Sequence, residues 1–121
     1  MNFEPAHLFQ HETDLLYVPP GHRLFTEGEP GEVMYVLISG AADISVNGKI
    51  VEQACAGALL GEMSLIEEAA PRSASVTTTT ECKLAPIDAK RFHFLIQNTP
   101  NFAIHVMRVV AARLRNTDKL L

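Results

Sequence analysis

The stretch GEMSLIEEAAPRSASV, residues 61–76, decides both the fold and the candidate site. Helix formers follow Gly61, and Arg72 comes ten residues after Glu62. The first backbone N–H groups of a helix have no partner within the helix and attract anions. An arginine offers a planar set of donors that fits a phosphate, whereas an ionised glutamate can only accept hydrogen bonds. We therefore expect a short helix opposite Arg72 and a ligand with one phosphate and a nearby hydroxyl group.

Each of these residues also has a simpler interpretation. Arg72 could pair with Glu67 or Glu68 on the surface, where ion pairs contribute little to stability. Glu62 could serve only to stabilise the first turn of the helix, and Ser73 could be an ordinary strand residue. These alternatives stay open for each residue taken alone. The ordered combination of residues favours ligand binding.

Length and charge limit the function classes. The chain has 121 residues, which predicts one domain, and 47% of them are hydrophobic, which is enough for a packed core. The net charge is −4, whereas a duplex-binding domain is expected to carry a basic face. Four basic residues near the C-terminus are interpreted as a solvated helix face: Arg108, Arg113, Arg115 and Lys119. We therefore expect no nucleic-acid partner.

Neither a membrane segment nor a disulfide framework is expected. No apolar run approaches the roughly 20 residues that span a bilayer. Residues 1–5 lack the basic start and apolar stretch of a signal peptide, so a cytoplasmic protein with no membrane partner is predicted. Cys55 and Cys82 are far apart and have no metal-binding spacing, and we expect both to be small buried strand residues.

The middle of the chain alternates short apolar runs with turn residues. Expected strands cover residues 15–18, 24–26, 33–38, 42–46, 49–55, 73–80 and 82–87. The run at 33–38 is continuously apolar, which is typical of a central strand, and Asn47-Gly48 is a strong hairpin signal. This spacing of strands predicts a sandwich, barrel or jelly roll.

Helices are expected at both ends, and the domain divides into a helical or turn segment at 1–14, a β-roll at 15–87 and helices at 88–121. Asp88 suits the cap of one helix, and Thr99 with Pro100 suits the start of another. The last helix is expected to carry an apolar stripe: Phe102, Val106, Val109, Val110 and Leu114. His7 and His11 have i, i+4 spacing, but two ligands make a weak site and we expect no metal.

The central motif resembles the phosphate-binding cassette of cyclic nucleotide-binding domains, as found in catabolite activator proteins and protein kinase A regulatory subunits. The chain reads LGEMSL at 60–65 and PRSASV at 71–76, in the order of the family pattern. The resemblance extends from about Leu15 onward and implies a mainly β fold. That fold is an antiparallel, jelly-roll-like β-roll with a phosphate-binding cassette at 60–76 that contains a helix, and with flanking C-terminal helices. One departure is Ala-Gly-Ala at 56–58, where the family usually has Pro-Gly-Asp.

The resemblance implies a role for each matching residue. Glu62 would accept a hydrogen bond from the ribose 2′-hydroxyl, and Arg72 would pair with the cyclic phosphate. Ser73 would add a hydroxyl donor and Ala74 a backbone N–H. The remaining expected ligand-binding residues are Gly61, Met63, Ser64 and Thr117, and the expected apolar walls are Val36, Leu59, Leu60 and Val76.

The ligand implied by the resemblance is cAMP, with cGMP as the other candidate. A hydroxyl after the cassette arginine occurs in binders of both nucleotides, so Ser73 fits either. Thr117 falls at the place where a threonine of bacterial cAMP receptors contacts the adenine amino group, although Asp118 follows it where those receptors have Ser. This match favours cAMP.

The expected function is a non-catalytic sensor whose C-terminal helix moves when the nucleotide binds. The sequence shows no nucleophile–base pair and no metal-ligand spacing, so neither an enzyme nor a cofactor beyond the nucleotide ligand is expected. The expected partners are a separate effector protein and a second copy joined through the C-terminal helix. The alternatives are a β-roll interaction module that has lost nucleotide binding and a cupin-like metalloenzyme.

Overall fold

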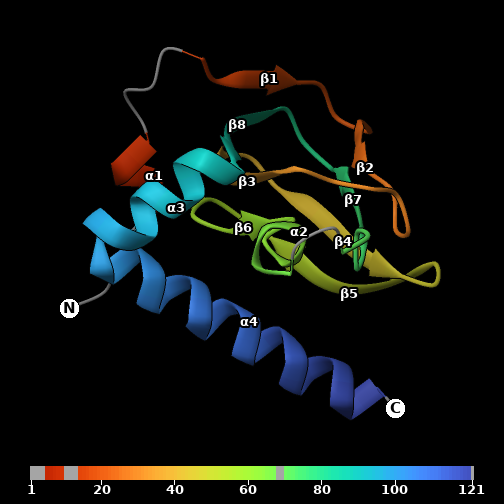
Figure 1. The fold of residues 1–121 in the computed structure, drawn as a ribbon. Coiled ribbons are helices and arrows are strands. Elements are labelled where there is room, and N and C mark those ends of the chain that lie inside the picture. Colours follow the sequence, from red (N-terminus) through yellow and green to blue (C-terminus); the bar gives the residue numbers. More distant parts are fainter. Residues whose placement is uncertain (1–4, 10–13, 68–69, 121) are drawn as a thin grey trace.

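The computed structural model describes residues 5–9, 14–67 and 70–120, and it contains two antiparallel four-stranded sheets flanked by helices (Figure 1). The strands are β1 (Leu16–Val18), β2 (Arg23–Phe25), β3 (Val33–Ser39), β4 (Ala42–Val46), β5 (Lys49–Ala54), β6 (Leu59–Leu60), β7 (Ser75–Thr78) and β8 (Cys82–Asp88). The helices are α1 (Pro5–Phe9), α2 (Met63–Ile66), α3 (Ala89–Asn98) and α4 (Pro100–Leu120). The expected mainly β fold with flanking helices is confirmed.

The strand order is β1-β8-β3-β6 in one sheet and β2-β7-β4-β5 in the other. The apolar run of β3 is central, as predicted, because it pairs with both β8 and β6. Its side chains alternate between two cores: Met34 and Val36 pack with the helices, whereas Leu37 packs inside the roll. The first sheet therefore separates a helix-facing core from a core enclosed between the two sheets.

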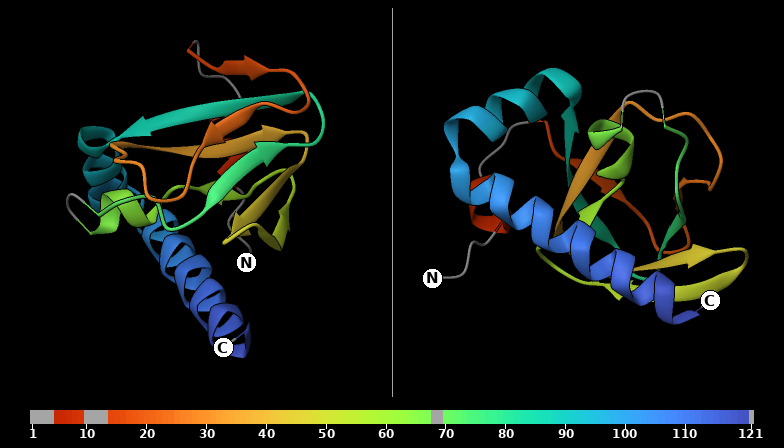
Figure 2. Two further views of the ribbon diagram at one scale, coloured as in Figure 1. Left: turned by 90° about the vertical axis from the view of Figure 1, so that its right-hand side faces the viewer. Right: turned by 60° about the horizontal axis from the view of Figure 1, so that its bottom comes forward.

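The β4–β5 hairpin forms at the predicted Asn47-Gly48 turn. Both residues have positive φ, 52° and 80°, and Val46 pairs with Lys49. Such a two-residue turn matches the twist of the strands it joins. The hairpin carries β5 to the edge of the second sheet, next to the last turns of α4 (Figure 2).

The C-terminal helices begin where the sequence predicts. The Asp88 carboxylate accepts a hydrogen bond from the Arg91 backbone N–H at 2.8 Å and so caps α3. Phe102 and Val106 of the expected stripe are buried against the helix-facing core, and Val109 and Val110 are partly buried there. Leu114, the last residue of the stripe, is 62% exposed because α4 has by then left this core.

Three smaller expectations have different outcomes. Cys82 is buried and its Sγ donates to the Ala41 carbonyl, as expected for a strand cysteine, but Cys55 is exposed because it lies in the turn after β5. The side chains of His7 and His11 lie outside the described part of the chain. Within the described residues, no cluster of three metal-ligating side chains occurs. No helix among them is long and apolar enough to cross a membrane.

Candidate nucleotide-binding site

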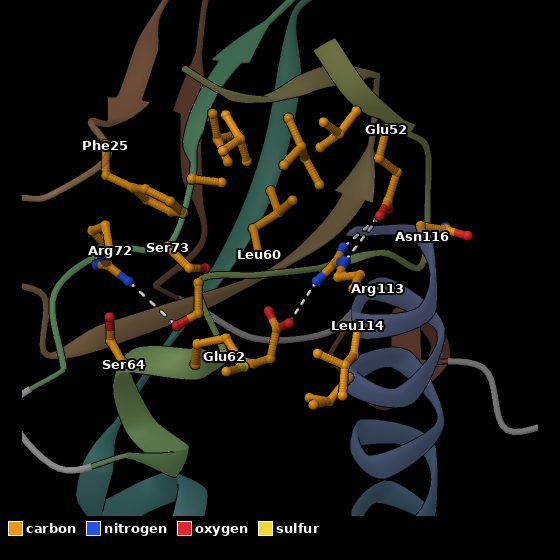
Figure 3. Close-up of a pocket in the computed structure, with 18 of the residues that line it drawn as sticks. Phe25, Glu52, Leu60, Glu62, Ser64, Arg72, Ser73, Arg113, Leu114 and Asn116 are labelled. Carbon is orange, nitrogen blue, oxygen red and sulfur yellow. Dashed lines mark hydrogen bonds and ion pairs between the residues drawn. The ribbon is translucent and has the colours of Figure 1, made fainter. Parts of the chain in front are cut away.

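A cavity of about 460 Å³ lies between the second sheet, the segment around α2 and the last turns of α4 (Figure 3). This volume lies in the range of small-molecule pockets. Its lining is mostly apolar at the strands, with polar groups gathered at two ends. Arg72, Ser73 and Ser64 lie at one end, and Glu52, Arg113 and Asn116 lie at the other.

Arg72 is positioned by its backbone before its side chain makes any contact. Its N–H donates to the Glu29 carbonyl at 2.7 Å, and its own carbonyl accepts from the Gly28 N–H at 2.8 Å. These bonds fix the segment before β7 against the turn after β2. A Cβ at Gly31 would collide with the guanidinium, so this glycine makes room for the arginine.

The Arg72 side chain lies inside the fold, with 7% of its surface exposed. The guanidinium carbon lies 4.1 Å from the centroid of the Phe25 ring, and Nη1 donates to the Gly61 carbonyl at a long 3.3 Å. Nε is buried and has no hydrogen-bond partner. Burial lowers the pKa of Arg72, and the charges of Tyr35 and Glu29 only partly oppose this effect.

The surface ion pair suggested for Arg72 can be checked for Glu67, one of its two suggested partners. In the described part of the chain Arg72 forms no ion pair, and Glu67 is exposed on the surface. Glu68 lies outside the described residues. A buried polar group without a partner is rare, and a buried cation that keeps spare donors at a cavity is suited to an anionic ligand.

The backbone of Gly61 has the left-handed conformation, with φ of 80°. A Cβ at this position would lie 2.5 Å from Arg72 Nη1 and 3.2 Å from the Phe25 ring. Glycine is therefore required twice, for the backbone conformation and for the close approach of Arg72. The turn delivers Glu62 and the first two residues of α2, Met63 and Ser64, to the floor of the cavity.

Glu62 is 2% exposed, and its Oε1 accepts a hydrogen bond from Arg113 Nη1 at 2.8 Å. The same guanidinium donates from Nε and Nη2 to the two oxygens of Glu52, at 2.9 and 3.1 Å. Burial alone would lower the pKa of Arg113, but its hydrogen bonds and charge interactions with Glu52 and Glu62 outweigh burial and raise it. The expectation that Arg113 lies on a solvated face is wrong.

Comparison with known proteins agrees with this geometry. The family model described as "Cyclic nucleotide-binding domain" matches residues 15–99. The chain belongs to the cyclic nucleotide-binding domain family. The match includes the turn after β2, the segment around α2 and Arg72, which are the parts that build the Arg72 end of the cavity.

Individual relatives and solved structures are similar to this chain over most of its length. The chain is 34% identical over 108 residues to the CRP-like cAMP-activated global transcriptional regulator of Mycobacterium tuberculosis, covering 85% of this chain and 48% of the relative. A structure titled as Sp-2Cl-cAMPS bound to a second PKAR domain has a TM-score of 0.78 at 26% identity, covering 88% of this chain and 70% of that one. The Thermus thermophilus catabolite activator protein has a TM-score of 0.75 at 25% identity, covering 92% and 59%.

The chain spans about half the length of the curated relatives that it matches. The M. tuberculosis relative is named as a transcriptional regulator. The expectation that this cyclic nucleotide-binding domain has no nucleic-acid partner is therefore not supported.

Most of the predicted site residues lie around one cavity. Its lining includes Gly61, Glu62, Met63, Ser64, Arg72, Ser73, Ala74, Leu60 and Val76. Ser64 Oγ is buried without a hydrogen-bond partner, whereas Ser73 is exposed. Ser73 precedes β7, so its interpretation as an ordinary strand residue is wrong. Thr117 lies in α4, but its side chain is outside the described part of the chain.

Two of the expected apolar walls need correction. Val36 and Leu59 do not line the cavity but lie in the helix-facing core. Both are fully buried, and their neighbours Leu37 and Leu60 take the opposite side of the sheet. Alternation along a strand sends adjacent side chains to opposite faces, so only one residue of each such pair can face the interior of the roll.

The sequence interpretation missed several lining residues. They come from the second sheet and from α4: Phe25, Ile44, Val46, Val51, Glu52, Val110, Arg113, Leu114 and Asn116. One signal was available for Arg113, because it follows Val109 and Val110 by four and three residues and so shares their helix face. Glu52 carried no such signal, because only the pairing of β5 places it opposite α4.

Proposed function

We propose that this domain binds a cyclic nucleotide, with cAMP favoured over cGMP, as a non-catalytic sensor. The observation that carries the proposal is Arg72, a buried guanidinium with an unpartnered Nε at the wall of a 460 Å³ cavity. Charge-assisted hydrogen bonds to a phosphate would satisfy donors that the protein leaves unused. Family membership supports the class of ligand.

In this proposal, different residues around the cavity bind the phosphate, the ribose and the base. Arg72 and Ser73 stand at the phosphate end, together with the backbone at Ala74. Glu62 uses Oε1 for Arg113, and a carboxylate has further acceptor capacity through Oε2 for a ribose hydroxyl. The apolar side chains of β4 and β5 on one side and of α4 on the other would enclose the base: Ile44, Val46, Val51, Val110 and Leu114.

The preference for cAMP rests on the relatives and on Thr117. The M. tuberculosis relative is named as cAMP-activated, and the structural neighbour with TM-score 0.78 is named with a cAMP analogue. In this proposal Thr117 contacts the adenine amino group from α4, and Ser73 serves the phosphate.

Direct titration tests the proposal. Calorimetry of the wild-type domain with cAMP should give a dissociation constant of about 1–10 μM, with weaker binding of cGMP. Saturating cAMP, at about 100 times the dissociation constant, should add about 2.7 kcal/mol to the free energy of unfolding and raise the Tm. AMP is the control, because its phosphate is not cyclised. If neither cyclic nucleotide gives heat or a Tm shift, the alternative of a β-roll interaction module replaces this proposal.

We further propose that the domain signals through α4, to a separate effector protein or to a second copy of itself. The exposed residues Ile104, Met107, Ala111 and Leu114 are spaced by three, four and three along α4. This 3–4 spacing is the seam of a two-stranded coiled coil. Ile104, Met107 and Leu114 are 41%, 62% and 62% exposed, so a partner helix would bury them.

Light scattering after size exclusion tests the self-association. We expect a concentration-dependent dimer that Met107→Glu converts to a monomer, because it places like charges opposite each other in the seam. Phe94→Glu is the control, because Phe94 is equally exposed but lies on α3. A wild-type domain that stays monomeric at high concentration would leave the effector protein as the remaining partner.

A further inference from the structure

Glu52 stands out because nothing in the cassette motif assigns it a role, yet both its oxygens are engaged at the cavity. It comes from β5 at the edge of the second sheet, and Arg113 comes from α4. The contact joins two elements that are 61 positions apart in the sequence. Figure 3 shows Glu52, Arg113 and Glu62 in one line along the α4 side of the cavity.

The guanidinium of Arg113 is held on two edges. Nη1 donates to Glu62 on the cassette side, and the Nε–Nη2 edge donates to Glu52 on the sheet side. A planar fork held on one edge can still turn about that contact, whereas two carboxylates on opposite sides fix both its plane and its position. Glu52 therefore adds a second fixed contact to the one that Arg113 makes with Glu62.

The position of Arg113 matters because the end of α4 has few other contacts. Ala111, Leu114, Arg115 and Asn116 are exposed. Within the described residues 111–116, Arg113 alone forms side-chain hydrogen bonds. The helix-facing core holds α4 only as far as Val110. The part of α4 that covers the cavity is thus docked mainly through this arginine.

We infer that Glu52 is a positioning residue for nucleotide binding: through Arg113 it holds the end of α4 over the cavity. The inference rests on the proposed function for its ligand. Glu62 is the expected acceptor for the ribose, and Arg113 already occupies one of its oxygens. With Glu52 on its other edge, Arg113 stays in place while Glu62 shares its charge with the ligand. Glu52 thereby slows the opening of α4 and the release of the nucleotide.

The first experiment measures α4 itself, without nucleotide. In Glu52→Gln, amide hydrogen exchange at residues 111–116 should become at least about fivefold faster, while exchange in β3 and β8 stays unchanged. Glu81→Gln is the matched control, because it removes a carboxylate from an exposed position outside the cavity. Unchanged exchange at 111–116 in Glu52→Gln would overturn the inference.

The second experiment measures release of a fluorescent cAMP analogue by stopped flow. Glu52→Gln should raise koff about threefold to tenfold and change kon by less than about twofold, because a looser lid affects release more than encounter. In the Arg113→Met background the same substitution should have no further effect. An equal effect in both backgrounds would show that Glu52 acts directly on the ligand, against the inference. If the wild-type domain binds no cyclic nucleotide, the proposed function fails and the exchange experiment alone decides the role of Glu52 in docking α4.

Discussion

Two arginines border the cavity, and they are partnered in opposite ways. Arg72 has an aromatic ring, one long bond to a carbonyl and an unpartnered Nε. Arg113 donates three hydrogen bonds to two carboxylates. Burial lowers the pKa of Arg72, whereas in Arg113 the carboxylates outweigh burial and raise the pKa. Their contacts, more than their burial, distinguish an arginine that is available to a ligand from one that holds the fold together.

The largest effect is expected from removing the paired arginine. Arg113→Met should lower the free energy of unfolding by about 2–3 kcal/mol, because Glu62 would be left buried without its counter-charge. We place the loss below that of a fully buried pair because 22% of the Arg113 side chain and 31% of the Glu52 side chain are exposed. Urea unfolding measures it. Arg115→Met is the control on the exposed side of α4, and an equal loss in both variants would contradict this role for Arg113.

Removing the unpartnered arginine should affect binding more than folding. Arg72→Ala should weaken cAMP binding at least tenfold, about 1.4 kcal/mol, because the phosphate loses its counter-charge. Stability should change less than in Arg113→Met, since no buried carboxylate depends on Arg72 among the described residues. Calorimetry and urea unfolding of the two variants measure both quantities. Arg108→Ala, on the exposed face of α4, should bind as wild type, and unchanged affinity in Arg72→Ala would exclude the assigned phosphate end.

A smaller effect should follow from crowding Arg72 without removing it. Gly61 and Gly48 have the same φ of 80°, but only a Cβ at Gly61 meets other atoms, whereas Gly48 has open space around it. Both glycine-to-alanine variants should lose about 1 kcal/mol of stability from backbone strain. Gly61→Ala should in addition weaken cAMP binding severalfold, because its methyl group displaces Arg72. Equal affinities in the two variants would show that the approach of Arg72 to Gly61 is unimportant.

The same contrast explains which parts of the site the sequence predicts. Arg72, Glu62 and Gly61 belong to one continuous motif, and local spacing is enough to predict that they act together. Arg113 and Glu52 are distant in sequence, and only the pairing of β4 with β5 and the path of α4 bring them together. A cluster of basic residues on one helix usually forms a solvated face, and this general rule gave the wrong interpretation for Arg113.

The apolar walls of the cavity show that the same limit on prediction applies to single residues. Leu59 and Leu60 are both expected as walls, yet Leu60 faces the cavity and Leu59 faces the helices. A two-residue apolar strand that is buried on both faces has no alternation of polar and apolar residues, so the sequence does not predict which face of the sheet each side chain takes. The strand β6 itself is absent from the expected strands, whereas the other seven lie within about two residues of their expected positions, because Gly, Pro and Asn-Gly turns delimit them.

The smallest expected effect concerns His105, whose charged form is disfavoured as that of Arg72 is. Burial, and then the nearby charge of Arg108, lower the pKa of His105 from its ordinary value of 6.5. The unfolded chain therefore binds a proton more readily than the folded domain, so this group's contribution to stability is present above pH 6.5 and is lost as the pH falls through the lower, folded pKa. Between pH 7.5 and 5.5, His105→Asn should reduce the fall in Tm by about 2 °C or less. Exposed His93, changed in the same way, is the control. An identical fall in Tm for wild type and His105→Asn would show that the pKa of His105 is the same in the folded and the unfolded chain, and it would contradict this prediction.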